Sequence, residues 1–192
     1  MSVIEYVSVF VSIVLGLAVA ELGSSLHKLM RARHRVQWDW MSLALAFVML
    51  LEVVQFWWLS YDWYARSAGL RLVEFLPNLF LLLLIYLMAA AVLPDEVPEE
   101  GLSLRQFYVE SARYFWGLVL AMTVAIILIL GPRNAGTTDF LAIARSQVVN
   151  IGLVLAIAPL LFVRNIRVHQ VVIIGFVGLV SWIYLSGLRS IH

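Results

Sequence analysis

A carboxyl group stands in the middle of a long apolar stretch of this sequence, where ionisable side chains are rare. Glu52 lies inside the stretch from Met41 to Tyr61, and Gln55 follows three residues later. At about 100° per residue, a helix places both side chains in one sector. A carboxyl group at the centre of a bilayer costs about 2.5–3.5 kcal/mol on insertion scales, so it is a candidate functional group by default. The chemistry open to it is contact with a proton, a cation or a small solute.

Further polar side chains fall at the same depth in other apolar stretches. If the stretches alternate in direction, Thr123, Asn150 and Ser181 lie level with Glu52. Together with Gln55 they would form one polar layer along a path through the membrane. The alternative for the three neutral residues is hydrogen bonding between helices, which contributes about 0.6 kcal/mol per bond in a measured membrane bundle. The sequence favours this alternative for them, whereas for Glu52 it favours function, because a carboxyl group is a costly way to join helices.

The first apolar stretch carries two more carboxyl groups and a regular row of small residues. Glu5 is predicted to lie at the outer mouth of the path and Glu21 at its cytoplasmic mouth. The alternative role of Glu21 is an ion pair with Lys28 or Arg31. A small residue recurs at every fourth position, a spacing that lets helix backbones approach closely: Ser8, Ser12, Gly16, Ala20 and Ser24. This helix is therefore predicted to lie centrally or at a subunit interface.

The elements that must hold these side chains are membrane-spanning helices. Of the 192 residues, 63% are apolar and 13% are charged, whereas soluble domains contain about 45–50% and about 25%. A soluble domain of about 150 residues leaves roughly 30% of its unfolded-chain surface exposed, so this apolar excess cannot be hidden in one core. A polytopic membrane protein is the class that remains. The net charge of +1 gives no reason to expect a nucleic acid partner.

Apolar stretches of about 20 residues predict an all-α polytopic membrane protein with six transmembrane helices in one domain, with short loops and no soluble domain. The predicted spans cover residues 3–22, 41–61, 75–93, 114–130, 141–163 and 171–188, and an amphipathic cytoplasmic stretch covers 102–113. Pro159 is expected to bend the fifth span, because it frees the carbonyl group of Leu155. Six short spans make a thin bundle, so a homo-oligomer is expected.

The distribution of Lys and Arg predicts the orientation in the cell inner (plasma) membrane. Eight basic residues fall in or beside the odd-numbered loops, and five fall on the opposite side. This places the odd-numbered loops in the cytoplasm and both termini outside it. The densest group follows the first span and is a candidate contact site for anionic lipid headgroups: Lys28, Arg31, Arg33 and Arg35.

Motifs for catalysis and for cofactor binding are not found in the sequence. No P-loop, G-x-G-x-x-G, H-E-x-x-H or G-x-S-x-G pattern stands in the required context. The sequence contains no cysteine, which excludes disulfides and thiolate metal sites. Neither an enzymatic activity nor a metal or cofactor is therefore predicted. A haem or metal ion held between His27 and His169 is an alternative, although histidines at the membrane interface are ordinary.

Two functions are consistent with these residues. The favoured one is a small oligomeric channel or transporter with a path lined by Glu52, Gln55, Glu21, Asn150 and Glu5. The alternative is a membrane scaffold, sensor or effector subunit that transports nothing and binds a protein partner or anionic lipid. The first function predicts a carboxyl group at Glu52 that water can reach. The second predicts a dry bundle in which Glu52 is hydrogen-bonded.

Overall fold

The computed structural model describes residues 3–188 of the chain, apart from 66–71 and 137–138. The α-helices in this part are α1 (Val3–Arg31), α2 (Trp40–Ala65), α3 (Leu72–Ala91), α4 (Leu104–Ala135), α5 (Phe140–Ser146), α6 (Val148–Ile157) and α7 (Ile166–Leu188). The short elements are the 3-10 helices η1 (Arg33–Arg35) and η2 (Ala158–Leu161) and the strands β1 (Val36–Gln37) and β2 (Leu102–Ser103). The predicted all-α fold is confirmed.

Four helices of the described chain are long and apolar enough to cross a membrane. These segments are Glu5–Arg31, Trp40–Ser60, Leu104–Pro132 and Ile166–Tyr184. Helices α5 and α6 pass the same test only together, across a bend of 75°, and the apolar part of α3 is shorter. The structure therefore supports four of the six predicted spans as unbroken long helices. The 102–113 stretch is not a separate helix, because residues 102–103 form β2 and residues 104–113 are the first part of α4.

Much of the surface of the bundle is apolar. Large apolar side chains are exposed on the long helices and on α6, for example Leu17, Trp58, Leu128, Leu155 and Trp182. Soluble monomers rarely expose contiguous apolar patches larger than a few hundred Å². Together with the four apolar helices, this exposure indicates a membrane protein.

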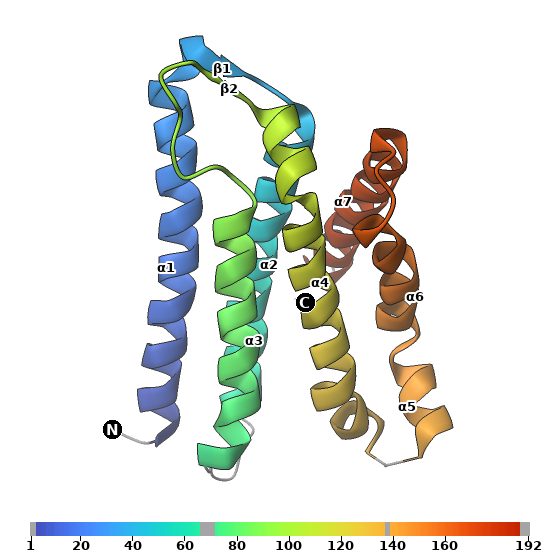
Figure 1. The fold of residues 1–192 in the computed structure, drawn as a ribbon. Coiled ribbons are helices and arrows are strands. Elements are labelled where there is room, and N and C mark those ends of the chain that lie inside the picture. The colour runs from blue at the N-terminus through green and yellow to red at the C-terminus, as the bar shows by residue number, and fades with distance from the viewer. Residues whose placement is uncertain (1–2, 66–71, 137–138, 189–192) are drawn as a thin grey trace.

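Helices α1 to α4 form a bundle, and α6 and α7 pack on its α2 and α4 side (Figure 1). Helix α1 packs on α2 and α3, α3 packs on α4, α4 packs on α6 and η2, and α2 packs on α7. One apolar cluster runs through all of these contacts and includes Leu15, Leu45, Leu82, Trp116 and Ile173. Helices α2 and α4 therefore connect the four-helix bundle to α7 and α6, respectively.

Helix α1 lies at the edge of the bundle. Its buried residues recur at spacings of three and four, as expected for one helix face against two neighbours: Val7, Val11, Leu15, Ala18, Leu22, Ser25 and Leu29. The small residues Gly16 and Gly23 are on the exposed face, and no atom lies within 4 Å of a Cβ placed on either. The prediction that α1 is central is thus wrong for the single chain, while a subunit interface on this helix stays a prediction.

The loops after α1 and α3 are joined at one end of the bundle, the top in Figure 1. Strands β1 and β2 pair in parallel, with Val36 opposite Leu102. Gly101 precedes this pair with a φ of +99°. A Cβ at that position would lie 2.9 Å from the carbonyl oxygen of Arg35, so a residue without a side chain is needed for the two loops to meet.

The connection from η2 to α7 reaches the same end of the bundle. Arg113, near the start of α4, donates from Nε to the carbonyl oxygen of Leu161 at 3.0 Å. The first, third and fifth loops of the predicted topology therefore lie at one end. The exposed basic residues at this end are Lys28, Arg31, Arg33, Arg35, Arg105, Arg113, Arg164 and Arg167.

The bend in the fifth predicted span is at Gln147 and not at Pro159. Helix α5 ends one residue before Gln147, and α6 starts one residue after it. Gly131 of α4 packs against this junction, where a Cβ would come within 3.0 Å of Cγ2 of Ile143 and 3.5 Å of Cγ of Gln147. Pro159 lies in η2, where the chain passes from α-helix to 3-10 helix. The expected bend thus occurs 12 residues earlier, at a close contact with α4.

Candidate functional site

A cavity of about 340 Å³ lies between α2, α3, α4, α6 and α7. Its wall is mostly apolar, with side chains such as Leu81, Met88 and Phe176. We call this space the central cavity. The polar side chains in its wall come from three helices: Glu52, Gln55 and Ser60 from α2, Thr123 from α4 and Asn150 from α6.

Helical periodicity explains why these side chains face the same space. On α2 the lining residues follow a spacing of three or four from Glu52 to Leu59, and on α4 they do so from Val119 to Leu130. Both helices thus turn one continuous face toward the cavity. The break at Gln147 sets the direction of α6, and Asn150 follows one turn later with its side chain in the cavity wall.

Three neutral polar residues of the wall, Thr123, Ser60 and Asn150, form hydrogen bonds within their own segments. Thr123 Oγ1 donates to the carbonyl of Val119 at 2.8 Å, and Ser60 Oγ donates to the carbonyl of Phe56 at 2.7 Å. Asn150 Nδ2 donates to Gln147 Oε1 at 2.6 Å. Asn150 and Thr123 therefore do not make the interhelical bonds that were the alternative expectation for them. Ser181 is not among the residues that line the cavity.

Glu52 differs from these three residues because its carboxyl group has no partner among the described residues. The side chain is half-buried in the cavity wall. No described residue donates a hydrogen bond to its carboxyl group or pairs with it. Next to it, the Tyr184 hydroxyl of α7 donates to the Leu51 carbonyl and joins α7 to this turn of α2. The acceptor oxygens of Glu52 are thus available to water, a proton or a cation.

The two carboxyl groups of α1 are not part of the central cavity. Glu5 is exposed near the start of the helix, and Glu21 is half-buried farther along it. Helix α1 contributes no lining residue to the cavity, and no ion pair joins Glu21 to Lys28 or Arg31. The structure thus brings Glu52, Gln55 and Asn150 together but places Glu5 and Glu21 elsewhere.

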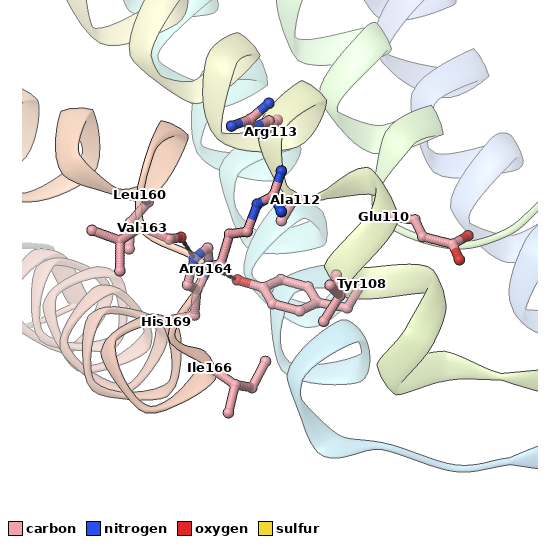
Figure 2. A pocket seen from close by; sticks show the side chains of 10 residues that line it. Tyr108, Glu110, Ala112, Arg113, Leu160, Val163, Arg164, Ile166 and His169 are labelled. Carbon is pink, nitrogen blue, oxygen red and sulfur yellow. Dashed lines mark hydrogen bonds between the residues drawn. The ribbon is translucent and has the colours of Figure 1, made fainter.

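A buried hydrogen-bond chain near the first residues of α4 was missed in the sequence. Trp116 Nε1 donates to the Tyr108 hydroxyl at 3.0 Å, and this hydroxyl is 2.6 Å from His169 Nδ1. His169 Nε2 lies 2.8 Å from the carbonyl oxygen of Val163, as the dashed line in Figure 2 shows. A carbonyl only accepts, so the neutral histidine carries its proton on Nε2 and accepts from Tyr108 on Nδ1. The side-chain polar groups of Trp116, Tyr108 and His169 then all have hydrogen-bond partners.

The sequence contains a pattern that indicates the α4 part of this hydrogen-bond chain. Leu104, Tyr108, Ala112 and Trp116 recur at every fourth position and are all buried, which marks one face of a helix. The partner His169 lies 61 residues from Tyr108 along the chain, and only the packing of α7 near α4 brings it there.

The structure does not support a metal or haem site between His27 and His169. His27 is exposed on α1 at the edge of the bundle, whereas His169 is buried and uses both ring nitrogens in hydrogen bonds. Within the described chain, no group of three or more His, Cys, Asp or Glu side chains is arranged to hold a metal ion.

The central cavity is thus the place in the molecule best suited to chemistry inside a membrane. A carboxyl group without a partner can take up and release a proton, or supply oxygen ligands to a cation. The amide groups of Gln55 and Asn150 add further polar contacts in an otherwise apolar wall. No known family model, curated protein or solved structure matches this chain.

Proposed function

We propose that the protein is a small oligomeric membrane channel or transporter in which Glu52 contacts a proton, a cation or a small solute in the central cavity. The observation that carries this proposal is the unpaired Glu52 carboxyl group in a cavity wall it shares with Gln55 and Asn150. A desolvated carboxyl group without a partner is costly inside a bilayer. Contact with water or with a transported ion removes that cost, and this accounts for a carboxyl group at position 52.

The broken helix supports the same proposal. Interrupted helices occur at membrane depth where they are buried in protein or line a water-filled cavity. Asn150 stands three residues after the break between α5 and α6, and it lines the central cavity. Discontinuous helices with exposed backbone groups also form ion sites in many transporters. We therefore assign α5 and α6 together to one crossing of the membrane.

In the proposed topology, α3 and the α5–α6 pair complete six crossings of the cell inner membrane. The end of the bundle that carries the first, third and fifth loops faces the cytoplasm, in accordance with its basic residues. Both termini are then outside the cytoplasm, although residues 1–2 and 189–192 lie beyond the described part of the chain. The basic group that contacts anionic lipid headgroups at the cytoplasmic end comprises Lys28, Arg31, Arg33 and Arg35.

Reconstitution in liposomes tests the proposed function. The purified protein is inserted into vesicles that contain a pH-sensitive dye, and a proton or potassium gradient is applied across the membrane. We expect the internal pH to change faster than in vesicles without protein. A rate equal to that of empty vesicles under both gradients would overturn proton and cation transport. A small solute would then be the one transport substrate left, beside the alternative of a scaffold, sensor or effector subunit that transports nothing.

We further propose that the copies of an oligomer meet on the exposed small-residue face of α1. Replacing Gly16 with Leu should convert the oligomer to monomers, because the added side chain prevents close approach of two helix backbones. The fold of one chain should tolerate the change, since no atom lies within 4 Å of a Cβ at this position. Light scattering of the detergent-solubilised protein after size exclusion measures the mass.

Gly175 of α7 provides the matched control for this test. It is also an exposed helical glycine with no atom within 4 Å of an added Cβ, but it stands on a different helix. Gly175→Leu should leave the mass of the assembly unchanged. Equal effects of the two substitutions would argue against an α1 interface, and so would a Gly16→Leu protein with the mass of the wild type.

A further inference from the structure

A second cavity, of about 320 Å³, lies between the first turns of α4 and the segment that joins η2 to α7 (Figure 2). Buried Tyr108 and His169 line it together with the exposed residues Arg113 and Arg164. Its remaining lining is mainly apolar. We call this space the arginine pocket. It lies at the basic end of the bundle and shares no lining residue with the central cavity.

Neither arginine of this pocket forms an ion pair with a described residue. The Nε atom of Arg113 donates to the Leu161 carbonyl, and its terminal amino groups bond to no residue that the structure describes. Figure 2 shows the Arg164 side chain extended toward Arg113. Glu110 is the one carboxylate among the described lining residues. It points away from both arginines in Figure 2, and its Oε1 accepts from Gln106 Nε2 at 2.9 Å.

The wall below the two arginines is buried, and its polar ring atoms are already hydrogen-bonded. Tyr108 and His169 are 3% and 5% exposed, and their ring atoms bond to each other, to Trp116 and to Val163. They therefore have no polar group left over for a counter-ion. Two guanidinium groups on a fixed wall form a ready site for an anion that accepts several hydrogen bonds, and phosphate is the anion that fits their planar fork geometry.

Apolar side chains continue from the pocket onto the outer surface. Phe162, which precedes the pocket-lining Val163, is 79% exposed. Val109 lines the pocket itself and is 54% exposed, and Val168 is exposed near the first turn of α7. A soluble phosphate would gain nothing from these side chains. A molecule with a phosphate group and hydrocarbon chains would cover them.

We propose that the arginine pocket binds the phosphate group of an anionic lipid, whose acyl chains lie over Phe162 and Val109. Basic pockets between helices at the cytoplasmic side of a membrane are known to bind such headgroups. The site is distinct from the basic residues after α1, because its arginines come from α4 and from the segment between η2 and α7. Lipid binding at this site does not depend on the proposed transport function, because it requires only that these helices lie in a bilayer.

Lipid binding to the detergent-solubilised protein tests this assignment. Native mass spectrometry is used to titrate the wild type with phosphatidylglycerol, phosphatidylcholine or inorganic phosphate. We compare an Arg113→Gln/Arg164→Gln variant with an Arg105→Gln/Arg167→Gln variant. The control pair removes the same charge from the same end of the molecule, where both side chains are exposed and outside the pocket. Thermal unfolding without lipid verifies that each variant is folded.

The pocket variant should bind phosphatidylglycerol roughly 100-fold more weakly, because each hydrogen bond to a charged group contributes about tenfold or more in affinity. The control variant should lose less than about threefold, as expected for rim charges. If Arg113→Gln unfolds the protein, Arg164→Gln alone, whose side chain bonds to no described residue, should still weaken binding at least about tenfold. Equal losses in the two double variants would overturn the proposal. Tight binding of phosphatidylcholine, or inorganic phosphate binding as tightly as the lipid, would also overturn it.

Discussion

Replacing Glu52 with Gln is expected to reduce ion flux in liposomes to the level of vesicles without protein. The substitution keeps the size and shape of the side chain, but an amide neither takes up a proton nor carries a charge toward a cation. The Glu52 carboxyl group has no partner among the described residues, so the variant should fold and melt like the wild type. The initial rate of dye response under a proton gradient measures the effect.

Two substitutions control for this result. Thr123→Val changes another polar residue of the central cavity, but the Thr123 hydroxyl bonds within its own helix and is expected to be dispensable for flux. Glu96→Gln changes the same functional group in an exposed loop. Both variants should retain the wild-type rate. If Glu52→Gln retains it too, Glu52 plays no part in the mechanism, and the proposed path through the central cavity has to be abandoned.

The helices were predictable where the apolar pattern alone determines them. Trp40–Ala65, Leu104–Ala135 and Ile166–Leu188 contain the long apolar runs read from the sequence. The break at Gln147 was not predictable, because no proline or glycine marks it. It coincides with the close contact between Gly131 of α4 and the α5–α6 junction, which is a tertiary effect. Likewise, α4 includes residues 104–113, where Leu104, Tyr108 and Ala112 are buried on one face.

The grouping of Glu52 with Asn150 was easier to predict than the packing of the helices against one another. Counting residues along alternating spans is enough to place Glu52 and Asn150 at one level, and the structure puts both in one cavity wall. Counting residues along the chain does not show which helices pack against each other. The sequence therefore could not show that α1, with Glu5 and Glu21, lies at the edge. The contact between Tyr108 and His169 was hidden for the same reason.

Replacing Tyr108 with Phe is expected to destabilise the protein strongly, although it removes a single oxygen atom. That oxygen accepts from Trp116 Nε1 and donates to His169 Nδ1, and all three side chains are buried. Each buried polar group left without a partner costs about 1–3 kcal/mol, so the loss should be about 2–6 kcal/mol. Unfolding in detergent micelles with increasing denaturant measures it. Tyr114→Phe, on an exposed tyrosine of the same helix, should change stability by less than about 0.5 kcal/mol.

A double substitution separates the hydrogen-bond chain from simple packing. Trp116→Phe alone leaves Tyr108 without one donor and also removes ring volume next to Phe176. In a Tyr108→Phe background, the Trp116 donor is already unpaired. Trp116→Phe should therefore lower the free energy of unfolding less in that background than in the wild type. If the two substitutions are additive, the rings stabilise this end of the bundle by packing alone. A smaller combined loss shows that the hydrogen bonds act as one unit that joins α4 to α7 beneath the arginine pocket.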